Sequence, residues 1–275
     1  MRRGAFIGPD GGIADRFRFA VFGDVRPPNA DMPETYPTAI IQHIVTNFTG
    51  LNAQFAVATG DYMFANTTES AEAQVALLLT AEHAFGGTVF HSLGNHECLT
   101  NTLGNCPNGV ESANIQVFHS RLASAYANVY FDWTVRTSSG DAHFIAAAPN
   151  AWSVAQESWL TAALAQPARY TFVISHIPPS SQRAPASVRT IEDAINARPG
   201  GVTLRLYGHT HEYRKLATNA VIVGNGGAPL GGSGNYGFVM VDQRADGDVS
   251  VVAYEIGNPP LLRDAFVVHP DGTAH

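Results

Sequence analysis

The sequence predicts an α/β fold in which polar residues follow the carboxyl ends of the strands. Between residues 17 and 93, three apolar strands alternate with two helices, a pattern typical of strands joined by right-handed crossovers. At 275 residues the chain can bury one large core. We therefore expect an irregular lead-in over residues 1–16 and a single domain over residues 17–275.

The first half of the chain supplies the strand–helix series. Strands are expected at residues 17–22, 55–59 and 88–93. Pro37 suits the first turn of a helix, and Ile40, Ile41, Ile44, Val45 and Phe48 form one apolar face at helical spacing. A second helix is expected over residues 70–84, with Val75, Leu78 and Leu79 facing inward.

The second half begins with a loop over residues 97–114 and a helix to about Tyr126. Ser153 with Gln156 forms a capping box that opens a helix, and Ser187 is expected to cap another that ends near Ala197. Further strands are expected at residues 129–136, 143–148, 170–175, 202–207, 220–223, 237–242 and 249–255. A glycine-rich loop over residues 224–234 lies within this last, all-β part.

Composition excludes several classes of function. The net charge of −7 and the pI near 5.8 argue against a nucleic-acid binder that works through a basic patch. No apolar run reaches the length of a membrane span, and the first residues lack the apolar stretch of a signal peptide.

The two cysteines, Cys98 and Cys106, lie close together in one loop. They are either free thiols or a local disulfide, and the poorly braced loop favours the disulfide. A disulfide suits an oxidising compartment, so a secreted or periplasmic location is favoured over the cytoplasm.

Metal-ligand residue types follow five of the expected strands. In an α/β sheet, groups at the carboxyl ends of the strands converge on one edge. Carboxylate, amide and imidazole groups suit borderline divalent metals, and the lack of thiolates disfavours a structural zinc site. The residues at these strand ends are Asp24, Asp61, Asn95 with His96, His176, and His209 with His211.

In this order the motifs resemble those of the calcineurin-like metallophosphoesterase superfamily, which includes purple acid phosphatases and phosphodiesterases. The motifs are Gly-Asp at residues 23–24 and 60–61, Gly-Asn-His-Glu at 94–97, His176, and Gly-His-Thr-His at 208–211. The resemblance implies a four-layer α/β/β/α sandwich with two mixed sheets. It also implies hydrolysis of phosphate esters by a metal-activated hydroxide at a dinuclear site.

The resemblance also implies a role for each residue. Asp61 bridges the two metals. Asp24 and His211 also bind the first metal, and Asn95, His176 and His209 also bind the second. His96 binds no metal but stabilises the transition state or protonates the leaving group, and Glu97 is expected to orient it. Asn95, His96 and Arg26 are expected to contact the substrate. The two metal ions are expected to be Mn, Fe, Zn, Ni or Co.

One position departs from the pattern. Most of the superfamily has Asp-X-His in the first motif, whereas this chain has Asp24, Val25 and Arg26. Purple acid phosphatases compensate with a tyrosine three residues after the bridging Asp, a position held here by Phe64. The Arg26 guanidinium either clamps a phosphate oxygen or pairs with a nearby carboxylate, and both interpretations stay open.

Several alternatives remain. The rival function is a catalytically impaired protein that binds one metal and phosphate, and a third is a mononuclear esterase acting on other esters. The substrate is expected to be a small phosphate ester. Arg26, Arg183 and Arg189 facing the metals would favour a monoester, whereas a cleft lined by Tyr62, Phe64 and Trp152 would favour a diester. His269 and His275, near the end of the sequence, are expected to be solvated.

Overall fold

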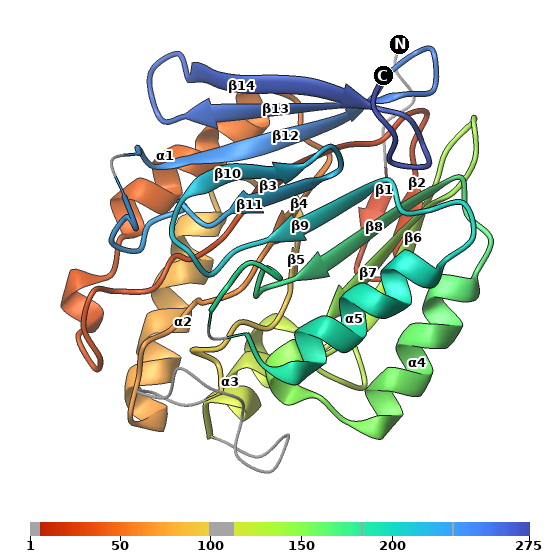
Figure 1. Cartoon of the computed structure of the whole chain (residues 1–275). Helices are drawn as coiled ribbons and strands as arrows, with labels where there is room; N and C mark the ends of the chain where they lie inside the picture. Colours follow the sequence, from red (N-terminus) through yellow and green to blue (C-terminus); the bar gives the residue numbers. More distant parts are fainter. Residues whose placement is uncertain (1–5, 99–112, 183, 233) are drawn as a thin grey trace.

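Two β-sheets pack face to face with helices on both outer faces (Figure 1). The structure is a computed structural model and describes residues 6–98, 113–182, 184–232 and 234–275. This arrangement is the four-layer α/β/β/α sandwich that the sequence predicts.

Among the described residues, one sheet has six strands in the order β14-β13-β12-β3-β4-β5. Its parallel part is β3, β4 and β5, and the other three strands run as antiparallel neighbours. The helices α1 and α2 bury apolar faces next to it, including Phe48 and Leu78. The bounds are β3 Arg18–Phe22, α1 Thr38–Gly50, β4 Phe55–Ala58, α2 Thr68–Glu82, β5 Thr88–His91, β12 Gly237–Gln243, β13 Val249–Glu255 and β14 Leu261–Val268.

The other sheet has eight strands within the described part of the chain, in the order β1-β2-β6-β7-β8-β9-β11-β10. Helices α4 and α5 cover its outer face, where Leu160 and Ile191 pack against Ile145 and Val173. The bounds are β1 Phe6–Gly8, β2 Gly11–Ile13, α3 Ala113–Leu122, β6 Phe131–Arg136, β7 Ala142–Ala147, α4 Val154–Ala165, β8 Tyr170–Ser175, α5 Ala186–Ala197, β9 Leu204–Tyr207, β10 Tyr213–Ala217 and β11 Ala220–Val223.

Aromatic side chains fill the space between the sheets. The ring centroid of Phe19 in β3 lies 5.2 Å from the ring centroid of Phe144 in β7 and 5.2 Å from that of Phe172 in β8. Both pairs are edge-to-face, the geometry that the ring quadrupoles favour. Strands β4 and β8 are buried along their whole length, as expected for parallel strands covered on both faces. This rigid core fixes the strand ends that carry the polar residues.

The structure differs from the sequence expectations at several elements. The expected irregular lead-in contains the hairpin β1–β2, which extends the larger sheet by pairing with β6. Strands β10 and β14 have no counterpart in the expected series, because both are partly exposed and lack a clean apolar run. Helix α5 begins at Ala186 with Pro185 as its N-cap, so Ser187 does not cap it.

The Ser187 hydroxyl instead donates to the carbonyl of Pro149, 2.7 Å away. The Ser153 cap is confirmed, because its hydroxyl accepts the backbone N–H of Gln156 at 3.1 Å. Among the described residues, no helix has the length and apolar character that crossing a membrane requires.

Candidate metal centre

The strand-end residues come together where the carboxyl ends of the two sheets meet. Strands β3, β4 and β5 are parallel neighbours in one sheet, and β8 and β9 are parallel neighbours in the other. Asp24, Asp61 and Asn95 follow the first group, and His176 and His209 follow the second. All of these expected ligands except the partly exposed His209 and His211 are almost fully buried.

Four of these residues hold the backbone in the left-handed region. Their φ angles are 55° at Asp24, 61° at Asp61, 74° at His209 and 51° at His211. Such angles cost free energy at a residue other than glycine and persist only where the surroundings impose them. The strand ends therefore turn sharply and direct these side chains toward one another.

A first group of donor atoms comes from Asp24, Asp61 and His211, which offer ligand atoms within 4.8 Å of one another. His211 Nδ1 lies 2.7 Å from the carbonyl oxygen of Pro229, so this nitrogen carries the proton. The unprotonated Nε2 faces Asp24, 3.5 Å from its Oδ1. A ligating histidine needs this tautomer.

A second group consists of Asp61, Asn95, His176 and His209. His176 Nδ1 lies 2.8 Å from the carbonyl oxygen of Thr59, which leaves Nε2 free to face the centre. This Nε2 lies 3.2 Å from Asp61 Oδ1 and 3.0 Å from Asn95 Oδ1. His209 Nδ1 lies 2.8 Å from the same amide oxygen. Two imidazole nitrogens and an amide oxygen thus converge beside the shared carboxylate.

Two glycines make the close approach possible. Gly60 has a φ of +113°, and a Cβ there would lie 2.6 Å from His176 Nδ1. A Cβ at Gly208 would lie 2.5 Å from Asp24 Oδ2. Any side chain at these positions would push the donors apart.

The charges of the centre shift the pKa values of its members. Burial raises the pKa of Asp24 well above its usual range. Burial acts the same way on Asp61, but the neighbouring His176, His96 and Arg26 outweigh it and hold the pKa of Asp61 well below its usual range. Burial lowers the pKa of His176, and the charges of Asp61 and Asp24 overcome it and raise the value to about 9. Burial lowers the pKa values of His96 and His209 to about 4.

Two further groups, Arg26 and His96, border the centre, and both contact the Phe64 ring. The Arg26 guanidinium carbon lies 4.8 Å from the Phe64 ring centroid, and the His96 ring centroid lies 4.7 Å from it. Arg26 Nε is 4.0 Å from Asp61 Oδ2, and His96 Nε2 is 3.9 Å from the same atom. Arg26 Nε and His96 Nδ1 are buried without a hydrogen-bond partner in the part of the chain that the structure describes. Both groups therefore have hydrogen-bonding capacity left for a ligand.

Glu97 acts differently from the expectation that it orients His96. Its buried carboxylate accepts backbone N–H groups from Asp61 at 3.0 Å, Tyr62 at 2.7 Å, Met63 at 3.3 Å and Gly94 at 2.7 Å. Glu97 therefore ties the turn after β4 to the turn after β5. Burial, followed by the charge of Asp61, raises the pKa of Glu97 to about 7.

Some other sequence expectations concern residues away from the centre. The Tyr62 hydroxyl lies 2.9 Å from the carbonyls of both Ala58 and Ser92 in the core, so Tyr62 neither binds a metal nor lines a cleft. Arg189 is exposed and pairs with Asp193 at 3.8 Å, so it does not face the centre. Arg183 and Cys106 lie outside the described residues, and the Cys98–Cys106 disulfide stays a prediction.

Sequence reasoning did not identify how Glu97 and Phe64 support the centre. Glu97 belongs to the Gly-Asn-His-Glu motif, so the sequence singles it out, but its partners Asp61, Tyr62 and Met63 follow the preceding motif and contact it only in the fold. The carboxylate, amide and imidazole donors fit borderline divalent metals with nitrogen and oxygen ligands. The residues that could hold such ions are Asp24, Asp61, Asn95, His176, His209 and His211.

The chain matches a known protein family. A family model described as calcineurin-like phosphoesterase matches residues 17–213. A search of curated proteins finds no match.

Several solved structures share the fold at low sequence identity. A purple acid phosphatase from yellow lupin is 14% identical with a TM-score of 0.67, over 92% of this chain and 54% of the lupin chain. A dimetal phosphatase from Danio rerio is 14% identical with a TM-score of 0.63, over 92% of this chain and 99% of that chain. The structure of PhoD is 12% identical with a TM-score of 0.64, over 96% of this chain and 72% of that one. The chain thus spans about half the length of the lupin phosphatase.

Proposed function

The chain belongs to the calcineurin-like phosphoesterase family, and we propose that it hydrolyses small phosphate esters at a centre that holds two metal ions. One observation carries the proposal. In both His211 and His176, the Nδ1–H donates to a backbone carbonyl and Nε2 faces the centre. The Nε2 of His211 faces the Asp24 carboxylate, and that of His176 faces the Asn95 amide oxygen. This orientation presents lone pairs to ions, as in metal sites whose ligands are held by outer hydrogen bonds.

Asp61 lies between the two groups of donors and is the bridging carboxylate of the proposal. Its Oδ1 faces His176 at 3.2 Å, and it also belongs to the cluster with Asp24 and His211. The backbone N–H of His96 donates to the same Oδ1 at 3.0 Å and holds the carboxylate in place. When bound, the ions supply a water of lowered pKa and neutralise charge on phosphate oxygens.

Arg26 and His96 are the residues proposed to contact the phosphoryl group. Arg26 Nε and His96 Nδ1, which have no hydrogen-bond partner among the described residues, can each hydrogen-bond a ligand, and both side chains pack against the Phe64 ring. A guanidinium binds equatorial oxygens of a transferring phosphoryl group. The imidazole is the group proposed to donate a hydrogen bond or a proton to the leaving oxygen.

A cavity beside His211 offers room for the organic part of the ester. Its volume is about 250 Å³, and Tyr213, Leu230, Tyr254 and Arg263 line it next to His211. Glu212 and Glu255 also line it, and Arg263 pairs with Glu255 at 3.7 Å. The aromatic and apolar groups suit a small organic substituent. Expected substrates are therefore small esters rather than polymers.

One observation favours the rival function. Arg26 Nε lies 4.0 Å from Asp61 Oδ2, so a fixed positive charge stands beside the carboxylate that would bridge two cations. Repulsion from this charge would weaken the first metal position. In that case the protein would hold one ion and bind phosphate without turnover.

Metal content and turnover measured on one sample test the proposal. The purified protein is analysed for metal per chain and assayed with p-nitrophenyl phosphate and bis-p-nitrophenyl phosphate after adding Mn, Zn, Fe, Ni or Co. About two ions per active chain with turnover support the proposal, and the two rates rank monoester against diester. One ion with no turnover under any metal supports the rival, and gain of turnover in Arg26→His would identify Arg26 as the cause.

A further inference from the structure

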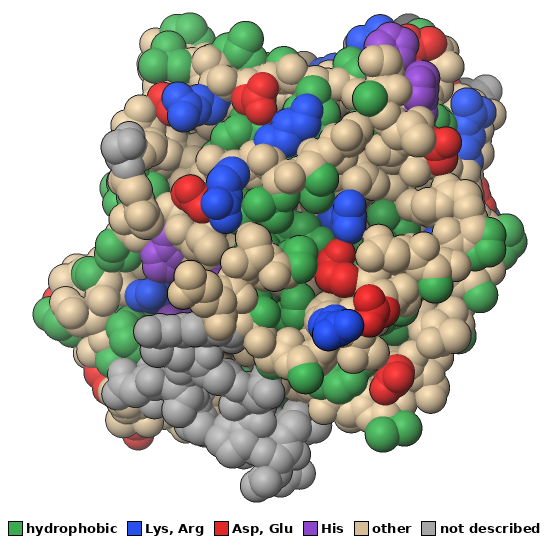
Figure 2. Space-filling model, in the orientation of Figure 1, with side chains coloured by type: hydrophobic (Ala, Val, Ile, Leu, Met, Phe, Trp, Pro, Cys, Tyr) green, Lys and Arg blue, Asp and Glu red, His purple; other side chains and the backbone are tan. Residues whose placement is uncertain are grey.

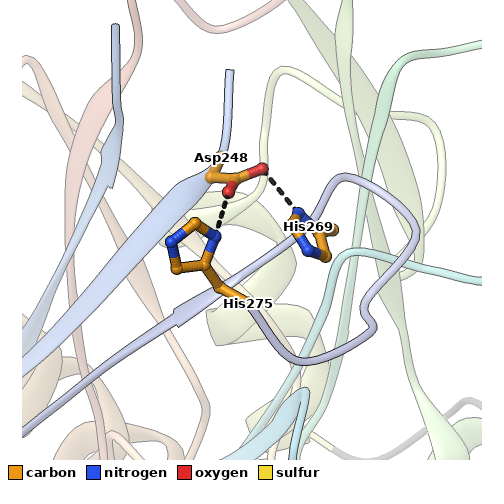
Figure 3. Close-up of side chains that lie close together, drawn as sticks. All are labelled: Asp248, His269 and His275. Carbon is orange, nitrogen blue, oxygen red and sulfur yellow. Dashed lines mark hydrogen bonds and ion pairs between the residues drawn. The ribbon is translucent and has the colours of Figure 1, made fainter. Parts of the chain in front are cut away.

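A second cluster of metal-ligand side chains lies at the other end of the molecule. It consists of Asp248, which precedes β13, His269, which follows β14, and His275 (Figure 3). The sequence predicts solvated histidines here, and the structure confirms that both are open to solvent, while each imidazole also contacts one buried carboxylate. Their side chains are 41% and 52% exposed, whereas that of Asp248 is 12% exposed.

The cluster is separate from the candidate metal centre. Strand β13 runs parallel to β3, because both are antiparallel to β12. Asp248 at the amino end of β13 therefore lies at the opposite edge of the sheet from Asp24, which follows the carboxyl end of β3. In Figure 2 the histidines visible on this face likewise occupy two separate places.

The geometry brings three potential ligand atoms together. His269 Nδ1 lies 2.9 Å from Asp248 Oδ1, and His275 Nδ1 lies 2.7 Å from Asp248 Oδ2. All three residues offer ligand atoms within 4.8 Å of one another. Ligands around one tetrahedral zinc ion lie roughly 3.3 Å apart, since each is about 2.0–2.2 Å from the metal. Small side-chain movements would therefore place the three atoms around one ion.

Backbone hydrogen bonds hold these residues in position. His269 N–H donates to the Thr273 carbonyl at 3.0 Å, and Gly272 N–H donates to the His269 carbonyl at 2.9 Å. A β-bridge joins Val268 to Ala274, so the chain folds back and sets His275 beside His269. The Asp248 N–H donates to Asp246 at 3.1 Å. The site is thus built by the fold and not by chance meeting of mobile side chains.

We propose that Asp248, His269 and His275 bind a divalent cation of the zinc class, independently of the phosphoesterase centre. Two imidazoles and one carboxylate are a ligand set for borderline metals, and the exposed side of the cluster leaves positions for water. Each imidazole moves its proton from Nδ1 to Nε2 and gives the Nδ1 lone pair to the ion. The ion joins the segment after β14 to the start of β13.

The first test counts ions. Wild-type protein and the His269→Ala/His275→Ala variant are stripped with chelator, and Zn²⁺ content is measured after equilibrium dialysis. The variant is expected to bind one ion fewer, with unchanged turnover per chain. His43→Ala/His83→Ala, which removes two exposed histidines elsewhere, is the matched control and is expected to bind as wild type. Equal Zn²⁺ content and affinity in wild type and the His269/His275 variant would overturn the proposal.

A second test separates this site from the phosphoesterase centre. In a His209→Ala/His211→Ala background, one equivalent of Zn²⁺ is expected to shift the ring ¹⁵N resonances of His269 and His275. Adding Asp248→Asn, which keeps the side-chain shape, is expected to weaken this binding at least tenfold. Unshifted resonances in the folded His209→Ala/His211→Ala protein would overturn the proposal even if the His269→Ala/His275→Ala variant of the first test fails to fold. If the dinuclear proposal fails, the wild-type protein would show no turnover and no ions at the phosphoesterase centre. The ion bound by Asp248, His269 and His275 would still be present.

Discussion

Arg26 Nε lies 4.0 Å from Asp61 Oδ2, beside the carboxylate that both groups of donor atoms share. The guanidinium has little room to leave, because its carbon packs 4.8 Å from the Phe64 ring centroid and its Nη1 donates to the Pro27 carbonyl at 3.1 Å. The sequence left open a carboxylate pair and a phosphate contact. The structure shows a long ion pair through Nε, and at 4.0 Å the N–H of this atom makes no hydrogen bond to Asp61 and can donate to a ligand.

Arg26→Ala is expected to lower kcat/KM for phosphate esters about 30- to 100-fold, because a charge-assisted contact to the phosphoryl oxygens is worth about 2–3 kcal/mol. Metal content is expected to stay constant or rise, since a positive charge leaves the centre. Arg189→Ala, an exposed arginine paired with Asp193, is the matched control. Wild-type kinetics in Arg26→Ala would exclude contact with the substrate.

His96→Ala is expected to lower kcat about 10²- to 10⁴-fold, the range typical of a lost general acid or base. Metal content per chain should not change, because the His96 ring is not among the expected ligands. Kinetics and metal analysis on the same sample check this, with His83→Ala as control. Loss of ions in the His96 variant would show that the residue is a ligand.

His211→Ala is expected to remove about one ion per chain, because this imidazole faces Asp24 in the first group of donors. Turnover should fall with the ion and recover in part at high metal concentration, since added metal drives occupancy of a weakened site by mass action. Metal content and rate are measured against added Mn²⁺ or Zn²⁺. An unchanged metal content would remove His211 from the ligand set.

Glu97→Ala is expected to destabilise the fold by about 3–5 kcal/mol, because four buried backbone N–H groups lose their charged acceptor. Urea unfolding of metal-free protein measures the change without interference from bound ions. The exposed Glu34→Gln is the control and should unfold as wild type. A loss below about 1 kcal/mol would mean that other groups order these turns.

Asp132→Asn tests a pH dependence away from the centre. Asp132 Oδ2 lies 2.8 Å from His143 Nε2, and this hydrogen bond is the chief cause that lowers the pKa of Asp132. A carboxylate whose pKa is lower in the folded state stabilises the fold above its unfolded pKa, near 3.9, and loses this contribution as pH falls through the folded value.

The Asp132→Asn variant should therefore be less stable than wild type by about 1 kcal/mol at pH 7. The difference should shrink as pH falls below 3.9. Urea unfolding from pH 7 to pH 3 provides the measurement, with Asp193→Asn as the exposed control. A difference that is constant across this range would assign the effect to packing and not to charge.

The sequence alone determined the strand–helix series and the candidate donor residues. Apolar runs predict most of the strands, although not the partly exposed β10 and β14, and the motifs place Asp24, Asp61 and His176 after three of them. These signals are local in the chain, so they can be read without knowing the fold.

The tertiary structure decided what depends on partners distant in sequence. The tautomer of His211 depends on Pro229, that of His176 depends on Thr59, and the role of Glu97 depends on turns more than 30 residues away. The Asp248 cluster also forms only when β13 and β14 pair. No local pattern encodes such contacts, because hydrogen bonds and electrostatic interactions depend on distance in space and not on separation along the chain.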